Sequence, residues 1–252
     1  MDLTKNKHYF DKIQQPYWIY FTTLTIPLFL LLVYLLWSTK VIPLTLYSYL
    51  IFYVVIYIYG TNIFFHRYWS HKQFVCNNII LKFFTIAGLF SLSGGPIHYV
   101  LVHRFHHHHS DDDLDPHSPC HGRYHAFIGW IFKAHTLKIP LKIIRDLLAD
   151  KNSWLLKIDA YKRQIIYTIV LITLVINKNI TVGLLLAMFT ALLIELSINA
   201  FLHDPKTKTA LNSNILFCWL TAGGLMHKIH HDKSSVLTKE DPGYYFVKLI
   251  CR

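Results

Sequence analysis

The stretch from His103 to His117 reads HRFHHHHSDDDLDPH, and the rest of the chain is arranged around it. On a helix, residues at i, i+3 and i+4 share one face, so His103, His106 and His107 present three imidazoles together. Neutral imidazole is the commonest side-chain ligand of metal ions. A histidine-rich run by itself also fits a polar tract that binds metal adventitiously. The stretch alone leaves both interpretations open.

Two further histidine clusters favour a built metal site. Upstream, His66 and His71 follow a long apolar run, and downstream the i, i+3, i+4 spacing recurs at His227, His230 and His231. Solvated loops do not explain three imidazole clusters that each adjoin apolar sequence. The clusters predict one metal site assembled at the ends of several helices.

The composition is that of an integral membrane protein. Of the 252 residues, 53% are hydrophobic and only 15% are charged, against about 25% charged in a soluble domain. The net charge of +11 does not indicate nucleic acid binding, because the basic residues flank apolar runs, where lipid headgroups lie. No linker interrupts residues 1–252, so we expect a single domain. The four cysteines form no CxxC pair, which excludes a thiolate metal module and indicates no disulfide framework.

The apolar runs predict an all-α fold with four transmembrane helices and a cytoplasmic helical cap that holds the metal site. The four predicted spans are Tyr17–Trp37, Val41–Phe65, Gln164–Ile176 and Ile180–Leu202, and Pro27 is expected to kink the first. A fifth apolar run, from Ile79 to Val102, is broken by Gly94-Gly95-Pro96, which favours a half-membrane or surface segment. Lysines gather in the amino terminus, the middle and the carboxyl end. The positive-inside rule therefore predicts that both termini and all histidine clusters are cytoplasmic.

The last predicted span carries its own polar stripe. Glu195, Asn199 and His203 follow one another at i, i+4 and i+8 and share one face. An ionisable residue in a membrane helix indicates function by default, although a structural hydrogen bond between helices explains Glu195 equally well. A structural role is less expected for His203, at the cytoplasmic end of the span.

These patterns resemble the membrane fatty acid desaturases of the stearoyl-CoA desaturase type, in their bacterial acyl-CoA branch. The family's HxxxxH, HxxHH and HxxHH motifs match the three histidine clusters, called boxes one, two and three below. Its NxxxH element matches Asn199 and His203. Gly94-Gly95-Pro96 before box two and the DPHSP run 115–119 after it also fit. The resemblance covers residues 60–231.

The resemblance implies a di-iron site with nine histidine ligands. Those ligands are His66, His71, His103, His106, His107, His203, His227, His230 and His231. Asn199 is implied to reach one iron through a water molecule. The candidates for orienting the ligands are Asp113, Asp115, His117 and Glu195. Because the chain lacks the Glu-x-x-His pattern of soluble di-iron carboxylate proteins, imidazoles are what the sequence supplies.

The resemblance also implies an activity, that of an oxidoreductase that introduces a double bond into a long acyl chain with O2 and two electrons. Acyl-CoA is the favoured substrate, over acyl-lipid or acyl-carrier protein. The chain has no flavin, haem or iron–sulfur motif, so an external donor of ferredoxin or cytochrome b5 type must supply the electrons. The protein would lie in the lipid bilayer, in the inner or plasma membrane if bacterial. A hydroxylase or ketolase with the same boxes, or an impaired metal-binding homologue, stays an alternative.

Several positions depart from the family pattern. Gly224 stands where the family has a glutamate, three residues before box three, and Lys228-Ile229 replaces Asn-Asn inside that box. Tyr99 replaces a tryptophan four residues before box two. Groups that orient metal ligands change affinity or activity by roughly 10–100-fold, so metal binding is implied more firmly than activity. We expect the end of the last span to pack beside Gly224, with Glu195 as the one embedded carboxylate able to substitute for the missing glutamate.

Overall fold

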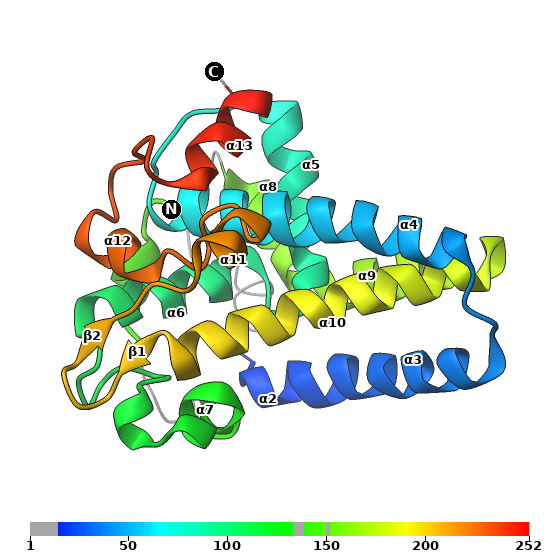
Figure 1. Cartoon of the computed structure of the whole chain (residues 1–252), viewed down its shortest axis with the longest axis horizontal. Helices are drawn as coiled ribbons and strands as arrows, with labels where there is room; N and C mark the ends of the chain where they lie inside the picture. The colour runs from blue at the N-terminus through cyan, green and yellow to red at the C-terminus, as the bar shows by residue number, and fades with distance from the viewer. Residues whose placement is uncertain (1–14, 134–138, 150–151, 252) are drawn as a thin grey trace.

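The structure, a computed structural model, describes residues 15–133, 139–149 and 152–251. Long helices project to one side of the molecule, and shorter helices with a small strand pair gather at the other (Figure 1). Among these described residues, three continuous helices are long and apolar enough to cross a membrane, namely Tyr17–Ser38, Pro43–Ser70 and Lys178–Phe201. The lysine-bearing amino terminus, residues 1–14, lies outside the described residues.

Two of the long helices change their winding along the way. The first consists of α2 (Tyr17–Tyr20), η1 (Phe21–Thr25) and α3 (Ile26–Ser38), and the second of α4 (Pro43–Tyr53) and η2 (Val54–Ser70); η1 and η2 are π-helical. Pro27 lacks an amide hydrogen and would crowd the carbonyl four residues earlier in an α-helix. The wider turn of η1 lies at that point, so the helix continues through the proline.

The other elements are shorter, apart from α10 (Lys178–Phe201). They are, in chain order, α5 (Asn78–Gly88), η3 (Leu89–Ser91), α6 (Pro96–His109), η4 (Pro119–His121), η5 (His125–Gly129), α7 (Trp130–Lys133), η7 (Leu141–Ile144), α8 (Ser153–Ala160), α9 (Lys162–Ile176), β1 (His203–Asp204), β2 (Thr209–Ala210), α11 (Ile215–Leu220), α12 (His227–Asp232) and α13 (Pro242–Ile250). The strands β1 and β2 pair antiparallel. The hairpin therefore begins where α10 ends.

The third predicted span differs from the structure. Residues Gln164–Ile176 form most of α9, whose 15 residues rise only about 22 Å, less than a hydrocarbon core of about 30 Å. A fourth crossing arises only if Asn78–Ser91 and Pro96–His109 count as one span, bent by 77° between them. The bend lies at the predicted Gly94-Gly95-Pro96 break. Helix 43–70 also runs five residues beyond the predicted end of its span, so box one begins inside the helix.

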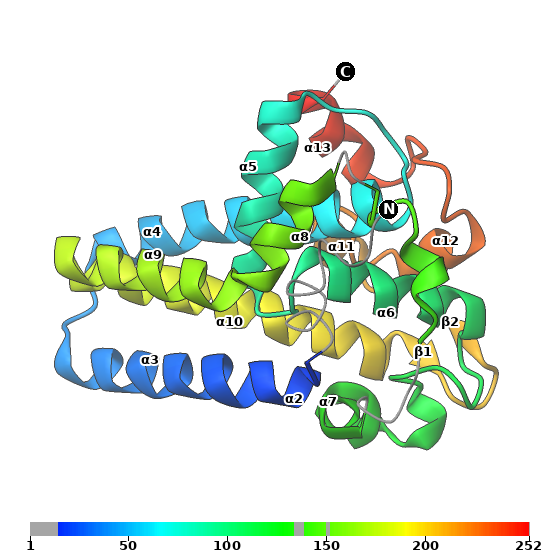
Figure 2. The ribbon, with the colours of Figure 1, turned by 180° about the vertical axis from the view of Figure 1, so that it is seen from behind.

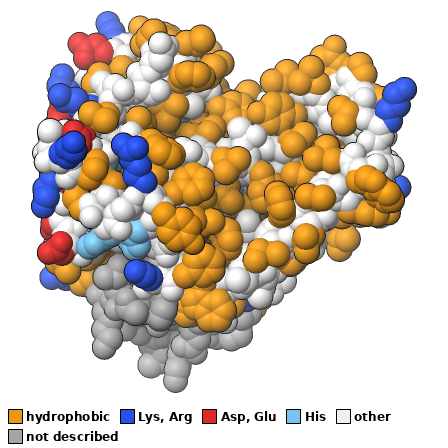
Figure 3. All heavy atoms as spheres, turned by 60° about the horizontal axis from the view of Figure 1, so that its bottom comes forward, with side chains coloured by type: hydrophobic (Ala, Val, Ile, Leu, Met, Phe, Trp, Pro, Cys, Tyr) orange, Lys and Arg blue, Asp and Glu red, His pale blue; other side chains and the backbone are white. Residues whose placement is uncertain are grey.

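The projecting helices carry an apolar surface. Leu30, Ile51 and Val175 are each more than half exposed, and Figure 3 shows apolar side chains covering this part of the molecule while charged ones gather mainly at the opposite end. Exposed apolar surface of this extent indicates contact with lipid. Inside, α10 lies directly against α4, since a Cβ atom on Gly183 would come within 2.6 Å of the Ser48 Cβ. Small residues allow such close approach of membrane helices.

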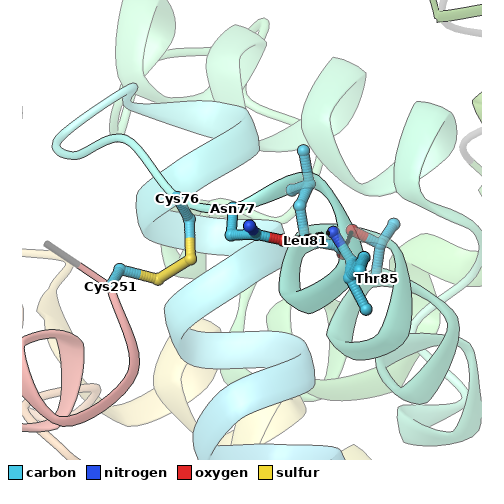
Figure 4. The surroundings of a disulfide bond; sticks show 6 residues. Cys76, Asn77, Leu81, Thr85 and Cys251 are labelled. Carbon is cyan, nitrogen blue, oxygen red and sulfur yellow. Dashed lines mark hydrogen bonds between the residues drawn. A yellow bond between two sulfur atoms is a disulfide. The ribbon is translucent and has the colours of Figure 1, made fainter.

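A disulfide bond joins Cys76, just before α5, to Cys251, just after α13 (Figure 4). It corrects the expectation of no disulfide: the two cysteines are 175 residues apart in sequence, and no local spacing reveals the pair. Cys120 and Cys218 are free. A buried ion pair between Arg67 of η2 and Asp241, the residue before α13, is a second contact between α13 and the part of the chain around box one.

Candidate metal centre

The winding of η2 brings the two histidines of box one together. In an α-helix, residues five apart point about 140° away from each other. In η2 the amide of His71 donates to the carbonyl of His66 at 3.2 Å, an i to i+5 bond that stacks the two residues one turn apart. Their ring centroids lie 5.2 Å apart. The HxxxxH spacing therefore fits a π-helix, whose pitch places both imidazoles on one face.

Box two lies on α6, as its spacing predicts. The helix begins at Pro96, and the Asp159 carboxylate accepts from the Ile97 amide at 2.7 Å, so a residue distant in sequence satisfies its first turn. Arg104, inside the box, donates to the carbonyls of Trp69 at 2.7 Å and Ser70 at 2.9 Å. Box two is thereby bonded directly to the end of box one.

Box three forms the short helix α12, and His203 comes from β1. The Nε2 atoms of His203 and His227 are 2.7 Å apart, and those of His227 and His231 are 3.1 Å apart. Box three also reaches box one, since His230 Nε2 lies 2.8 Å from His66 Nε2. Three stretches from different parts of the chain thus converge on one place.

The nine histidines fall into two groups. The five-histidine group consists of His66, His71, His103, His107 and His230. The four-histidine group consists of His106, His203, His227 and His231. Within each group the ring nitrogens that could bind an ion all lie within 4.8 Å of one another. The two groups contain together the nine histidines that the resemblance implies as ligands.

The spacing of the nitrogens fits a shared ion in each group. Two imidazoles that bind one first-row ion at about 2.1 Å and at right angles hold their nitrogens roughly 3.0 Å apart. The His230–His107 pair is at 3.0 Å and the His106–His231 pair at 3.3 Å. An all-imidazole donor set suits iron among other first-row metals.

In three of the histidines, one from box two, one from β1 and one from box one, a hydrogen bond at Nδ1 leaves Nε2 free to bind a metal ion. His106 Nδ1 lies 2.9 Å from Asp115, His203 Nδ1 lies 2.9 Å from Asp111, and His66 Nδ1 lies 3.2 Å from Asn62 Oδ1. Such partners fix the tautomer and increase the basicity of the ligating nitrogen.

The asparagine at position 62 was not singled out from the sequence. Its amide nitrogen donates to the carbonyls of Thr221 and Ala222, both at 2.8 Å. The Asn62 oxygen must therefore accept from His66, which defines the His66 tautomer. The same side chain links box one to the turn before box three, a contact over 159 residues of sequence that no local pattern indicates.

The residues proposed to orient the ligands lie in different surroundings. Asp115 is buried and contacts His106, and the buried His117 lies beside it with its Nδ1 3.5 Å from Asp115 Oδ1. Asp113 is exposed, and within the described part of the chain it contacts no histidine. Asp111, which the sequence did not single out, is buried, adopts a positive φ of 62° and contacts His203. Aspartate tolerates this left-handed conformation better than most residues.

Glu195 lies close to box three, with which it shares a cavity, but its hydrogen bond goes elsewhere. Glu195 Oε2 accepts from the Tyr99 hydroxyl at 3.0 Å, and no hydrogen bond to box three is present among the described residues. The end of α10 does lie beside Gly224, since Glu195, Asn199, Gly224 and His227 line one cavity of about 30 Å³. His230 Nδ1 is buried without a partner in the described structure. This box-three ligand candidate thus lacks the support that His106 and His203 have.

Burial keeps the box-three imidazoles neutral at pH 7. Burial, reinforced by His203, lowers the pKa of His231 to about 4, although Asp111 and Asp115 oppose the shift. Burial and the neighbouring His66 hold the pKa of His230 well below its ordinary value. Metal binding requires the neutral form, so box three is in the form that accepts a cation.

His108 and His109, which follow box two directly, belong to neither group. His108 is exposed, and His109 Nδ1 contacts Asp112 at 2.9 Å. Of the four consecutive imidazoles in the sequence, only the first two therefore belong to the candidate metal centre.

The fold and the site define a helical, membrane-type protein with two adjoining groups of histidines that could each hold a metal ion, and known proteins share sequence with the chain. No family model matches it. An acyl-CoA 5-desaturase of Anemone leveillei is 38% identical over 96 residues, which are 38% of this chain and 28% of that protein. The delta-9 acyl-lipid desaturase 1 of Arabidopsis thaliana is 37% identical over 73 residues, 29% of this chain and 24% of the relative. The delta-9 desaturase-like 1 protein of the same plant is 43% identical over 90 residues, 36% and 30% respectively.

These matches confirm the relationship to the fatty acid desaturases, whose acyl-CoA and acyl-lipid members are the relatives named. The matched stretches span about a quarter of the length of the first relatives, from 23% to 28%. The three relatives are plant proteins, so the bacterial branch stays a prediction.

Proposed function

We propose that this chain is a membrane-bound fatty acyl desaturase with two iron ions. The observation that carries the proposal is the pair of adjoining imidazole groups, five and four histidines, whose ring nitrogens converge. Histidines with separate structural roles would not be expected to gather in two such groups. The named relatives are desaturases, which supports the reaction, and the nine histidines are proposed as the metal ligands.

Each group would hold one ion, and Asn199 would reach an iron through water. Asn199 lines the same cavity as His106 and His227, which supports that role. Bound iron would supply the activation of O2 that removes hydrogen from an unactivated methylene. The protein's own contribution is to hold the tautomers through Asp111, Asp115 and Asn62, and to keep the imidazoles neutral by burial.

The substrate is a long acyl chain, and acyl-CoA is the favoured form. The relatives include an acyl-CoA 5-desaturase and a delta-9 acyl-lipid desaturase, so both kinds of acyl carrier occur among them. Electrons come from an external carrier of ferredoxin or cytochrome b5 type. The two candidate forms of the substrate are distinguished by product analysis.

Expression in a host that lacks its own desaturase tests the function. Gas chromatography should show a new monounsaturated fatty acid, and purified protein should hold about two irons per chain. His107→Ala should reduce product by roughly 100-fold or more, whereas His108→Ala, exposed and outside both groups, should leave it unchanged. Hydroxylated products would identify a hydroxylase instead, and iron without any product would identify an impaired homologue, which the missing partner of His230 favours.

The site and both termini are proposed to face the cytoplasm. Labelling with a membrane-impermeant thiol reagent tests this, because Cys120 is exposed on the side of the metal centre and Lys178 begins α10 at the far end. Lys178→Cys should react in intact cells, and Cys120 only after permeabilisation. The reverse order would overturn the orientation.

A further inference from the structure

Helix α13 is linked at both of its ends to the part of the chain around box one. Before its first residue, Asp241 forms the buried ion pair with Arg67 of η2, at 2.7 Å. After its last residue, Cys251 is joined to Cys76, which follows His71 of box one by five positions (Figure 4). A thiol can break the second link by exchange, whereas it leaves the ion pair unchanged. The two ends of α13 therefore respond differently to a reductant.

Between these two links, α13 packs with one face against the helix that carries box one. Val247 is buried, and the Phe246 ring lies 6.3 Å from the Tyr59 ring of η2. The opposite face is more exposed, since Tyr245 is 47% and Leu249 is 75% exposed. A helix of nine residues is only marginally stable without tertiary support. The position of α13 on the box-one helix consequently depends on the links at its ends.

A reductant can reach the disulfide bond from one side. Cys251 is 5% exposed and therefore shielded, but Cys76 is only partly buried. Cys76 lies in the segment between η2 and α5, where its neighbours Val75 and Asn77 are exposed. Thiol–disulfide exchange begins with attack on a single sulfur atom, so access to Cys76 is sufficient. Reduction therefore does not require the protein to unfold.

Breaking the bond would loosen the end of box one. Residues 72–75 alone separate Cys76 from His71, which belongs to the five-histidine group. Within this segment, the Gln73 side-chain amide donates to the Ser234 carbonyl at 2.7 Å, and the intact disulfide holds the segment at a second point. After reduction only non-covalent contacts hold it, so His71 gains freedom to move away from an ion bound by its group.

We propose that Cys76–Cys251 is a redox-controlled clasp that strengthens metal binding by the five-histidine group. A cellular dithiol reduces the bond: the two cysteines gain two electrons and two protons, and the dithiol becomes a disulfide. Hydrogen peroxide reverses the reaction: it takes two electrons and two protons from the cysteines and becomes two molecules of water. The oxidised clasp retains the metal ion, and the reduced clasp releases it more readily.

The compartment decides whether a reductant is present. Cytoplasmic thiols are kept reduced, and the disulfides that form there are usually transient, catalytic or redox-sensing. The cytoplasmic orientation belongs to the function proposed above, so this part of the inference rests on it. In the cytoplasm the clasp is therefore open under ordinary conditions and closes under oxidative conditions.

The redox state of the clasp is measured by counting thiols in full-length protein from cells quenched with acid. After denaturation, a maleimide reagent that increases the mass labels every free cysteine. Cys120 and Cys218 are free in both states, so the oxidised protein carries two labels and the reduced protein four. Cells grown normally should give four labels, and cells treated with hydrogen peroxide should give two. The same count under both conditions overturns the redox control.

The effect on the metal centre is measured on iron-loaded full-length protein in lipid nanodiscs. Tris(2-carboxyethyl)phosphine reduces the disulfide, and a chelator then removes iron, which elemental analysis follows. One of the two ions should be lost roughly tenfold faster from the reduced protein, while loss of the other is unchanged. Cys76→Ser should show the fast rate with and without the reductant. Cys120→Ser, a change at an exposed cysteine outside the clasp, is the matched control and should keep the response.

The outcomes separate the clasp from the proposed function. Equal rates of iron loss from the oxidised and the reduced protein overturn the clasp. Equal acceleration for both ions overturns it as well, because it would show only a general loss of stability. Desaturated product in the expression test, together with either result, would leave the function standing. A chain that forms no product but loses one ion faster on reduction would support the clasp and contradict the function.

Discussion

The two histidine groups are built from the same side chain but are supported differently. In the four-histidine group, two imidazoles contact buried carboxylates, His106 with Asp115 and His203 with Asp111. In the five-histidine group, the neutral amide of Asn62 supports His66, and His230 Nδ1 has no partner in the described structure. A carboxylate makes the ligand more basic than an amide does. We therefore expect the four-histidine group to hold its metal ion more tightly, although it has fewer ligands.

The surroundings of the two groups also differ in charge. Two arginines each directly follow a histidine of the five-histidine group in the sequence. Arg67 follows His66 and is fully buried, and Arg104 follows His103. Asp241 and Asp146 pair with them. The five-histidine group thus depends on ion pairs that hold its helices, whereas carboxylates contact the rings themselves in the four-histidine group.

The largest expected effect comes from breaking the Arg67–Asp241 pair. Asp241 accepts from both terminal nitrogens of Arg67, at 2.7 and 3.0 Å, and from the Gly243 amide at 2.8 Å. Asp241→Asn leaves a buried guanidinium without a counter-charge and should lower the free energy of unfolding by about 3–5 kcal/mol. Thermal unfolding in detergent measures this, and the exposed neighbour change Glu240→Gln is the control. Equal stability of the two variants would contradict the importance of the pair.

A change of pH should affect the metal-free protein next most strongly. The pKa of His231 is about 4 in the folded state and about 6.5 when unfolded, so the unfolded state binds more protons between these values. Stability is therefore lost as the pH falls from 6.5 to 4, by up to about 3 kcal/mol from this residue. Unfolding of chelated protein at pH 7 and pH 4.5 measures the loss.

One variant and the metal-loaded protein sharpen that measurement. His231→Gln should flatten the pH dependence, and bound metal should suppress it, because the ion competes with the proton for the ring nitrogen. Within the centre, His231 should protonate before His230, since Asp111 and Asp115 raise the pKa of His231. Protonation of His230 first would contradict the charge difference between the groups.

The smallest expected effect compares the supports of the two groups directly. Asp115→Ala should weaken metal binding by the four-histidine group by roughly 10–100-fold. Asn62→Ala should weaken the five-histidine group less, because a neutral hydrogen bond contributes about 1 kcal/mol. Elemental analysis after graded dialysis against a chelator gives both values, with the exposed Asp113→Ala as control. A larger loss in Asn62→Ala would reverse the proposed order of the two groups.

The sequence by itself determined the class of the centre and much of the fold. The i, i+3, i+4 spacing places His103, His106 and His107 on one face because α-helical geometry is local. Long apolar runs define their helices for the same reason, and Gly94-Gly95-Pro96 marks the bend before box two. Each of these features depends on residues close together in the chain.

Only the tertiary structure decided which groups support the ligands. Asn62 meets the turn at Thr221, Cys76 meets Cys251 and Tyr99 meets Glu195, and each pair is separated by about a hundred residues or more. Asp111, which has a positive φ, contacts His203, whereas Asp113 is exposed. The pairing of His66 with His71 requires the π-helical winding of η2, which apolar periodicity does not specify. Such contacts arise from the packing of whole helices, so the local spacing of residues in the sequence does not predict them.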